Sequence, residues 1–185
     1  MTIVRGLSVD MTTFEREQRY LRKWRGKAIR GDRLAMANVA ATYRILGNYR
    51  LAARWWKKVA EQGDGNALTE WGYSLQHGVG VRRDTKAAER AFRAAIVSKD
   101  ITEYGREEAM YHLAVLLLGK RSASSRRAAL KVLQSAMADQ DYPQAEALLQ
   151  SLGSEEIQKI CTCHRHLRPR LAQRHCRVHG PRQAR

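Results

Sequence analysis

The chain has 185 residues, of which 44% are hydrophobic, so it can bury the core of one domain of ordinary size and is not globally disordered. Lys and Arg number 34 against 18 Asp and Glu, which gives a formal net charge of +16. The excess is concentrated at the two ends, with +5 in residues 1–33 and +6 in residues 154–185. This balance indicates an anionic partner (nucleic acid, an acidic protein or an anionic membrane surface), unless the charge serves solubility alone.

No segment has the composition of a membrane span. The longest uncharged apolar run covers residues 113–119, far short of the ~20 residues needed to cross a bilayer. The N-terminal residues contain no apolar stretch of signal-peptide length. We therefore expect a cytoplasmic protein without a membrane span.

Residues 1–31 are expected to contain an N-terminal helix that packs on a following repeat domain. Thr12 and Glu15 have the spacing of a capping box, in which each side chain bonds the backbone N–H of the other residue. Residues 32–153 then show apolar residues at helical spacing, without the alternation that is typical of strands. The fold class is predicted to be all-α.

An internal repeat organises residues 32–153. A bulky apolar residue is followed eight positions later by Asp in four places: Trp24/Asp32, Trp56/Asp64, Phe92/Asp100 and Leu133/Asp141. Successive Asp residues are 32, 36 and 41 positions apart. A small residue then opens a new apolar-periodic stretch after each Asp: Ala35, Ala67, Ala109 and Ala145. This period, filled by two helical stretches, predicts a short α-solenoid of antiparallel helix pairs.

Small residues recur at equivalent positions of the two helices in each unit. The first-helix positions are Ala40, Gly72 and Ala114, and the second-helix positions are Ala52, Ala88 and Ala129. Neighbouring helices can approach closely at these positions, and the space between them is expected to be filled by Trp56, Phe92 and Leu133. Core packing is the favoured interpretation for the four tryptophans, Trp24, Trp55, Trp56 and Trp71. Two adjacent tryptophans cannot point the same way on a helix, so Trp55 is the one of its pair expected nearer the surface and is the candidate partner-binding anchor.

Residues 67–96 carry a recognisable set of residues: Ala67, Trp71-Gly72, Gly78-Val-Gly80-Val81, Asp84, Ala88, Phe92 and Ala95. With them, the segment resembles a Sel-one-like repeat, a relative of the tetratricopeptide repeat. The preceding unit matches through Ala52, Trp55-Trp56 and residues 60–64, but it lacks the glycine loop and looks more like a plain tetratricopeptide repeat. The resemblance covers roughly residues 32–141.

The resemblance implies a right-handed superhelix of helix pairs that acts as a protein-binding scaffold, in a family without a common catalytic constellation. Bacterial proteins of this kind often serve as adaptors, regulators, effectors or immunity proteins beside secreted toxins. The sequence contains no P-loop, GxGxxG, HExxH or GxSxG motif. His77 and His112 lie within repeat helices and are expected to be surface or packing residues rather than bases. We therefore expect a protein that is not an enzyme.

Residues 154–185 form a basic, Cys/His-rich tail of a different kind. Cys161 and Cys163 make one close pair, and Cys176 and His179 make a second, with twelve residues between the pairs. Two such pairs suit a tetrahedral zinc site, because each supplies one edge of the tetrahedron and a reducing cytoplasm disfavours disulfides. Zinc would also give a fold to a segment with few bulky apolar residues.

The tail permits other interpretations. His164, His166 and His175 compete as ligands, and a single residue separates Cys161 from Cys163, which makes a tight knuckle. A disordered basic tail and a pair of reactive redox thiols therefore stay open as alternatives. Seven arginines follow without any acid after position 156, and arginine suits both phosphates and carboxylates. Nucleic acid and an acidic protein are both candidate partners of this tail.

Two functions follow from these patterns. The main expectation is a protein-binding scaffold, an adaptor or immunity-type protein of a bacterium, that binds an acidic partner. The alternative is a zinc-supported nucleic-acid-binding protein that uses the arginine-rich tail. Basic residues in the turns between paired helices are candidate partner contacts, with solvated turn charge as the ordinary explanation: Arg82, Arg83, Lys120, Arg121, Arg126 and Arg127. The sequence indicates no oligomeric state.

Overall fold

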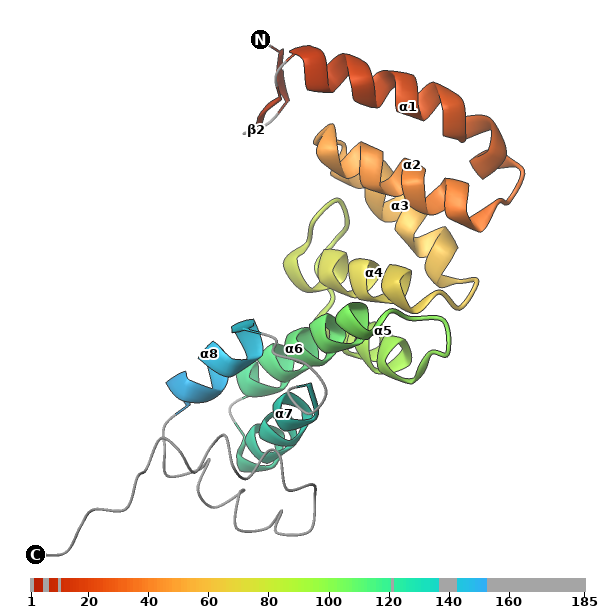
Figure 1. Cartoon of the computed structure of the whole chain (residues 1–185). Coiled ribbons are helices and arrows are strands. Elements are labelled where there is room, and N and C mark those ends of the chain that lie inside the picture. The colour runs from red at the N-terminus through yellow and green to blue at the C-terminus, as the bar shows by residue number, and fades with distance from the viewer. Residues whose placement is uncertain (1, 5–6, 10, 121, 137–142, 153–185) are drawn as a thin grey trace, which may run out of the picture.

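The computed structural model describes residues 2–4, 7–9, 11–120, 122–136 and 143–152. The elements in these ranges are β1 (Thr2–Val4), β2 (Leu7–Val9), α1 (Met11–Ile29), α2 (Arg33–Ile45), α3 (Tyr49–Ala60), α4 (Gly65–His77), α5 (Thr85–Val97), α6 (Glu103–Gly119), α7 (Ala123–Ala136) and α8 (Pro143–Ser151). Each helix packs on the next along the whole series, as Figure 1 shows. The predicted all-α, solenoid-like fold of packed helix pairs is confirmed.

Three helix pairs build the solenoid: α2 with α3, α4 with α5, and α6 with α7. We call α2, α4 and α6 the first-helix row, and α3, α5 and α7 the second-helix row. In the first-helix row α4 also packs directly on α6. At the N-terminal end of the series α1 packs on α2, and at the other end α8 packs on α7. Among the described helices, none is both long enough and apolar enough to cross a bilayer.

A short antiparallel hairpin of β1 and β2 precedes α1, with Thr2 opposite Val9. The sequence pattern does not predict this hairpin, because strands of three residues are too short to show alternation. All three residues of β1 are β-branched, which suits extended backbone. The structure also corrects the predicted capping box: α1 begins at Met11, so Thr12 lies within the first turn rather than before the helix.

Six successive helices, α2 to α7, begin with a side-chain cap. In each, an oxygen of the residue before the helix accepts a hydrogen bond from the backbone N–H three positions later, at 2.8–3.3 Å. The capping residues are Asp32, Asn48, Asp64, Asp84, Thr102 and Ser122. Each cap satisfies an N–H that the helix itself leaves without a partner. The repeating Asp of the sequence thus marks a helix start in the first two units, whereas Thr102 caps α6.

The core contains the small and bulky residues that the repeat pattern marks. The small residues at the equivalent positions of both helices are all buried: Ala40, Gly72, Ala114, Ala52, Ala88 and Ala129. Phe92 and Leu133 are fully buried, whereas Trp56 is half-buried. One core cluster covers α1 to α4 and a second covers α4 to α8, and Leu68 and Trp71 of α4 pack against both. The large side chains therefore fill the space that the small ones leave.

Ion pairs and a hydrogen bond connect the turns between successive helix pairs along one edge of the solenoid. Arg33 at the start of α2 pairs with Asp64 at 3.9 Å and also with Asp100, which precede α4 and α6. The backbone N–H of Gly65 donates a hydrogen bond to the carbonyl of Asp100 at 2.7 Å. These bonds connect three consecutive turns and so fix the spacing of the helix pairs.

Candidate functional site

Charge is divided between the two rows of helices. The helices α3, α5 and α7 together hold ten Lys and Arg but a single acid, Glu89. The helices α2, α4 and α6 hold three arginines against four glutamates. The cations of the second-helix row, which we call the basic surface, are all exposed: Arg50, Arg54, Lys57, Lys58, Lys86, Arg90, Arg93, Arg126, Arg127 and Lys131. A strong positive potential therefore lies along one row only.

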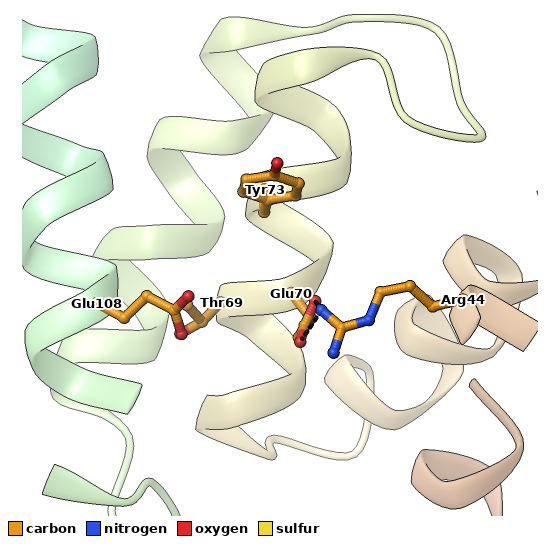
Figure 2. A pocket seen from close by; sticks show the side chains of 5 residues that line it. All are labelled: Arg44, Thr69, Glu70, Tyr73 and Glu108. Atoms are coloured by element: carbon orange, nitrogen blue, oxygen red, sulfur yellow. Dashed lines mark hydrogen bonds and ion pairs between the residues drawn. The ribbon is translucent and has the colours of Figure 1, made fainter. Parts of the chain in front are cut away.

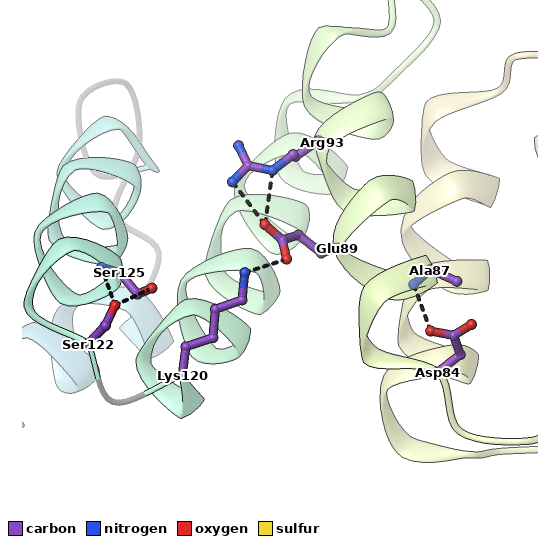
Figure 3. Close-up of polar contacts among 7 residues, drawn as sticks. All are labelled: Asp84, Ala87, Glu89, Arg93, Lys120, Ser122 and Ser125. Atoms are coloured by element: carbon purple, nitrogen blue, oxygen red, sulfur yellow. Dashed lines mark hydrogen bonds and ion pairs between the residues drawn. The ribbon is translucent and has the colours of Figure 1, made fainter.

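The single acid of the second-helix row, Glu89, is fully engaged. Its carboxylate accepts hydrogen bonds from Arg93 at 3.0 Å on its own helix and from Lys120 at 2.8 Å after α6, as Figure 3 shows. These two cations, the bond from Lys120 first, hold the pKa of the Glu89 carboxyl below its usual value. The arrangement connects the second helix pair to the third.

Most of the basic surface has no internal counter-ion. Within the described part of the chain, six of its ten cations make no ion pair, no side-chain hydrogen bond and no cation–π contact: Arg50, Arg54, Lys86, Arg90, Arg127 and Lys131. An exposed cation without a partner is hydrated by water alone. A carboxylate or phosphate can therefore bind these side chains without breaking a bond inside the protein.

The candidate contacts Arg82 and Arg83 lie in the loop between α4 and α5, and both are exposed. Arg83 also has an internal role, because its Nε donates a hydrogen bond to the carbonyl of Gln76 at 3.0 Å near the end of α4. That carbonyl belongs to the last helical turn, where no intrahelical donor remains. Arg82 has no such bond within the described residues and keeps its guanidinium free.

The candidate contacts around the turn between α6 and α7 also divide into engaged and free residues. Lys120 binds Glu89, and Nη2 of Arg126 donates a hydrogen bond to the carbonyl of Leu152 at 3.3 Å. Arg127 is exposed. Arg121 lies outside the described residues. Of this group, Arg127 is the described residue that is free to meet a partner.

Trp55 lies half-buried in α3, packed against the core cluster of α1 to α4. Its neighbour Trp56 is also half-buried and packs against the same cluster. The Nζ of Lys58 lies 4.8 Å from the centroid of the Trp55 ring, a cation–π contact. Trp55 therefore contributes to the core and presents part of its surface beneath a lysine of the basic surface.

A small pocket of about 250 Å³ opens on the first-helix row, where α2, α4 and α6 face one another. Figure 2 shows its lining, which consists of Arg44, Thr69, Glu70, Tyr73 and Glu108. Nη1 of Arg44 contacts both carboxylate oxygens of Glu70, at 3.0 and 3.3 Å. The pocket thus contains one ion pair and one further carboxylate. Its excess of acidic groups contrasts with the excess of cations on the basic surface.

Burial controls the protonation of the two carboxyl groups in this pocket. It raises the pKa of Glu70, and the nearby charge of Arg44 partly opposes the rise. Burial also raises the pKa of Glu108, and the negative charge of Glu70 adds to the effect, with Arg44 opposing it. The pocket can accept a proton or a hydrogen-bond donor at Glu108.

His112 of α6 lies in a group of aromatic rings between α4, α5 and α6. It stacks on Phe92 with ring centroids 5.4 Å apart and planes at 14°, while Tyr73 and His77 approach edge-on at 5.4 and 6.2 Å. Burial, together with the neighbouring His77, lowers the pKa of His112 to about 4. The ring is therefore neutral near pH 7 and serves as a packing residue, as expected from its position in a repeat helix.

The predicted metal ligands all lie outside the described residues: Cys161, Cys163, Cys176 and His179, together with the competing His164, His166 and His175. The zinc site and the role of the arginines around it stay predictions from the sequence. Within the described ranges, no group of three or more His, Cys, Asp or Glu side chains is arranged to hold a metal ion.

The sequence gives no local signal for the pocket on the first-helix row. Arg44, Glu70 and Glu108 belong to three different helices, and 26 and 38 positions separate them along the chain. No motif connects residues at such distances, and a single charged residue on a repeat helix looks like ordinary surface charge. Helical wheels of α2, α4 and α6, compared with one another, could have indicated that these three residues lie on the same side of the first-helix row.

The comparisons with known proteins add no family to these features, since no protein-family model matches the chain and no curated protein matches it significantly.

Proposed function

We propose that this chain is a non-enzymatic scaffold that binds a partner protein with an acidic surface. The observation that supports the proposal is the separation of charge, with ten cations and one acid along the second-helix row. A solenoid presents such a row as one extended surface, because each helix pair repeats the same orientation. An adaptor or immunity-type role, which the Sel-one-like resemblance implies, requires such a surface and no reactive group.

Glu70 and His112, two titratable groups of the first-helix row, have partners inside the fold, which is compatible with a scaffold. Glu70 is bound by Arg44, and His112 stacks on Phe92 as a neutral ring. Thr69, the hydroxyl in the pocket, donates a hydrogen bond to the carbonyl of Gly65 within its own helix at 3.1 Å. None of these contacts pairs a nucleophile with a base.

Binding through exposed charges has a measurable signature. The Debye length is about 30 Å at 0.01 M salt and about 8 Å at 0.15 M, so exposed cations act at long range only at low ionic strength. The rate of association with an acidic partner should therefore fall steeply as salt rises, while the dissociation rate changes less.

The experiment begins with the full chain purified from its native host at low salt and examined by native mass spectrometry. An acidic protein in complex is the expected finding, and its affinity is then measured with purified components. The triple variant Arg54→Glu, Arg90→Glu and Arg127→Glu reverses one free cation on each helix of the second-helix row. We expect it to bind at least about tenfold more weakly.

A control variant distinguishes the effect of where the charges lie from the effect of the change in net charge. Arg19→Glu, Lys23→Glu and Lys27→Glu make the same change of charge on α1, where all three side chains are exposed. We expect less than about a threefold loss from this control. Equal loss in both variants would refute a specific surface. Co-purified nucleic acid that is lost on removal of residues 154–185, with no protein partner, would favour the nucleic-acid-binding alternative.

A further inference from the structure

A groove of about 820 Å³ lies at the N-terminal end of the solenoid and shares Arg50 with the basic surface. Its lining comes from α1, from the turn between α2 and α3 with the start of α3, and from Gly80 in the loop after α4. We call it the α1 groove. Its volume lies in the range of roughly 300–1,000 Å³ that ligand-binding clefts occupy.

The α1 groove has an apolar floor. Leu21 of α1 and Leu46 of the α2–α3 turn are 7% and 6% exposed, and Phe14 of α1 is half-buried beside them. Phe14 and Leu21 lie seven positions apart and so share one face of α1. The floor can receive one bulky apolar side chain.

Three arginines surround this floor: Arg22, Arg25 and Arg50. All three are exposed, and within the described part of the chain none makes an ion pair or a hydrogen bond. Among the described residues, no acid lines the groove. Elsewhere the protein does supply acids to its arginines: Arg33 binds Asp64 and Asp100, and Arg44 binds Glu70. The three guanidinium groups of the groove are thus left without an internal counter-ion.

Gly80 fixes the third segment of the groove. Its φ of +75° is left-handed, and a Cβ there would overlap the carbonyl oxygen of Tyr49 and lie 2.8 Å from the backbone nitrogen of Arg50. The loop after α4 can therefore rest directly on the start of α3 only because this residue is glycine. In Figure 1 this loop reaches toward the α2–α3 turn. The groove is a built feature of three segments rather than a gap beside α1.

We propose that the α1 groove binds an acidic segment of the partner protein, with an aliphatic or aromatic side chain seated on its floor. Carboxylates of this segment bind Arg22, Arg25 and Arg50, because guanidinium groups match carboxylates in bidentate geometry. The apolar side chain on Phe14 and Leu21 supplies a desolvated anchor. This inference rests on the proposed function and identifies where on the scaffold the partner docks.

Two other occupants suit the groove less well. The tail of the chain itself, residues 154–185, has a net charge of +6, so the three arginines repel it. A nucleic-acid strand would satisfy the arginines through its phosphates, but its bases stack on aromatic or guanidinium faces. The groove does contain aromatic rings (Phe14, Tyr43 and Tyr49), but its floor also offers aliphatic surface at Leu21 and Leu46, which an apolar side chain covers better than a base does. An acidic peptide with an apolar anchor uses both parts of the groove.

The test starts from an unbiased probe, a phage-displayed library of random 12-residue peptides selected on the full chain. We expect enriched peptides to be acidic and to share one bulky apolar residue. A fluorescein-labelled enriched peptide is then titrated by fluorescence anisotropy. The double variant Arg22→Glu and Arg50→Glu should weaken its binding at least thirtyfold, whereas Arg50→Lys should weaken it only a few-fold, because lysine keeps the charge and loses the bidentate fork.

The matched control is Arg30→Glu with Lys99→Glu, which makes the same charge change at two exposed cations in the turns before α2 and α6, outside both the groove and the basic surface. Circular dichroism of each variant should match the parent, and binding by the control should change less than threefold. Enriched peptides without acids, or equal loss in both double variants, would overturn the proposal. Loss of binding to a 20-nucleotide single strand in the groove variant, with peptide binding unchanged, would overturn it in favour of nucleic acid.

The native partner distinguishes this proposal from the scaffold function. If the partner loses affinity for the basic-surface variant but not for the groove variant, the scaffold function stands and the groove proposal fails. If the chain has no protein partner, the scaffold function fails. The peptide titration then shows independently whether the groove recognises acidic segments.

Discussion

Gly72 in α4 faces the ring of Phe92 in α5 with no room for a methyl group between them. A Cβ on Gly72 would lie 2.6 Å from Cε1 and 2.9 Å from Cδ1 of that ring. Phe92 is fully buried and His112 stacks on it, so the ring has no free space into which it can move. In the next helix pair the equivalent positions hold Ala114 and Leu133. Ala114 is larger than Gly72, and Leu133 is smaller than Phe92.

Replacing Gly72 by alanine should destabilise the protein by about 1–2 kcal/mol. Overpacking of a core contact costs roughly 1–3 kcal/mol, and the better helix propensity of alanine offsets up to about 1 kcal/mol. In a Phe92→Leu background, which recreates the alanine–leucine combination of the next pair, Gly72→Ala should be neutral or stabilising. Urea unfolding of the four proteins measures this coupling. Equal effects of Gly72→Ala in both backgrounds would contradict the contact.

Asp84→Ala should lower the stability of the protein by about 1 kcal/mol through loss of the cap on α5. The Asp84 carboxylate accepts the hydrogen bond of the Ala87 backbone N–H at 2.9 Å (Figure 3), and no other side chain of α5 replaces it. Asp84→Asn is the control, because asparagine caps equally well and should leave the thermal midpoint within a degree or two. A midpoint lowered equally by both substitutions would indicate that the charge matters instead of the cap.

His112 should make the protein less stable as the solution is acidified. Its folded pKa of about 4 lies below the usual 6.5, so the unfolded chain binds the proton first. The stabilising contribution is complete above pH 6.5 and is lost as the pH falls toward 4. Between pH 7.5 and 5 the loss amounts to about 2 kcal/mol.

The variant His112→Phe retains an aromatic ring beside Phe92 and removes the titration. Thermal midpoints of variant and parent are measured from pH 7.5 to 5. As the pH falls, the midpoint of the parent should fall more than that of the variant. A constant difference across this range would assign the pH dependence to other groups. Protonation of Glu89, whose pKa is lowered, falls below this range and does not interfere.

Glu108→Gln should raise the thermal midpoint slightly at pH 7. Burial and the charge of Glu70 raise the pKa of Glu108, so the stability it contributes is complete below pH 4.5 and is lost as the pH rises through the folded pKa. Glutamine imitates the protonated form, and because Glu108 is partly exposed we expect a gain of about 1–2 °C. Glu61→Gln, on an exposed carboxylate outside the pocket, is the control. A gain that persists at pH 4 would refute this explanation.

The sequence predicts the helical framework well because the signals involved are local. The small residue opposite each bulky one, such as Gly72 opposite Phe92, follows from their repeated spacing. Asp32 and Asp64 mark helix starts because a cap acts over three residues. The pattern fails at Asp100, where Thr102 takes over the cap and Asp100 instead pairs with Arg33 across two turns.

The sites could not be predicted, because each one combines distant segments. The α1 groove brings Arg22 and Arg25 beside Arg50 and Gly80, and Glu70 meets Glu108 only when α4 packs on α6. Even a correct list of helices does not determine which exposed arginine has a counter-ion. Arg22 and Arg33 look alike in the sequence, yet only Arg33 meets an acid among the described residues.

The contact of the Gly80 loop with α3 adds a second connection between the first two helix pairs, beyond the packing of α3 on α4. In a solenoid, stability is approximately the sum of what each repeat contributes and what each neighbouring interface contributes. An extra interface at one boundary makes the segment from α2 to α5 open and close as a single cooperative unit. Partial unfolding is then expected to begin with α8 and the third helix pair. The α1 groove, which is built from α1, the first helix pair and the loop after α4, would survive it.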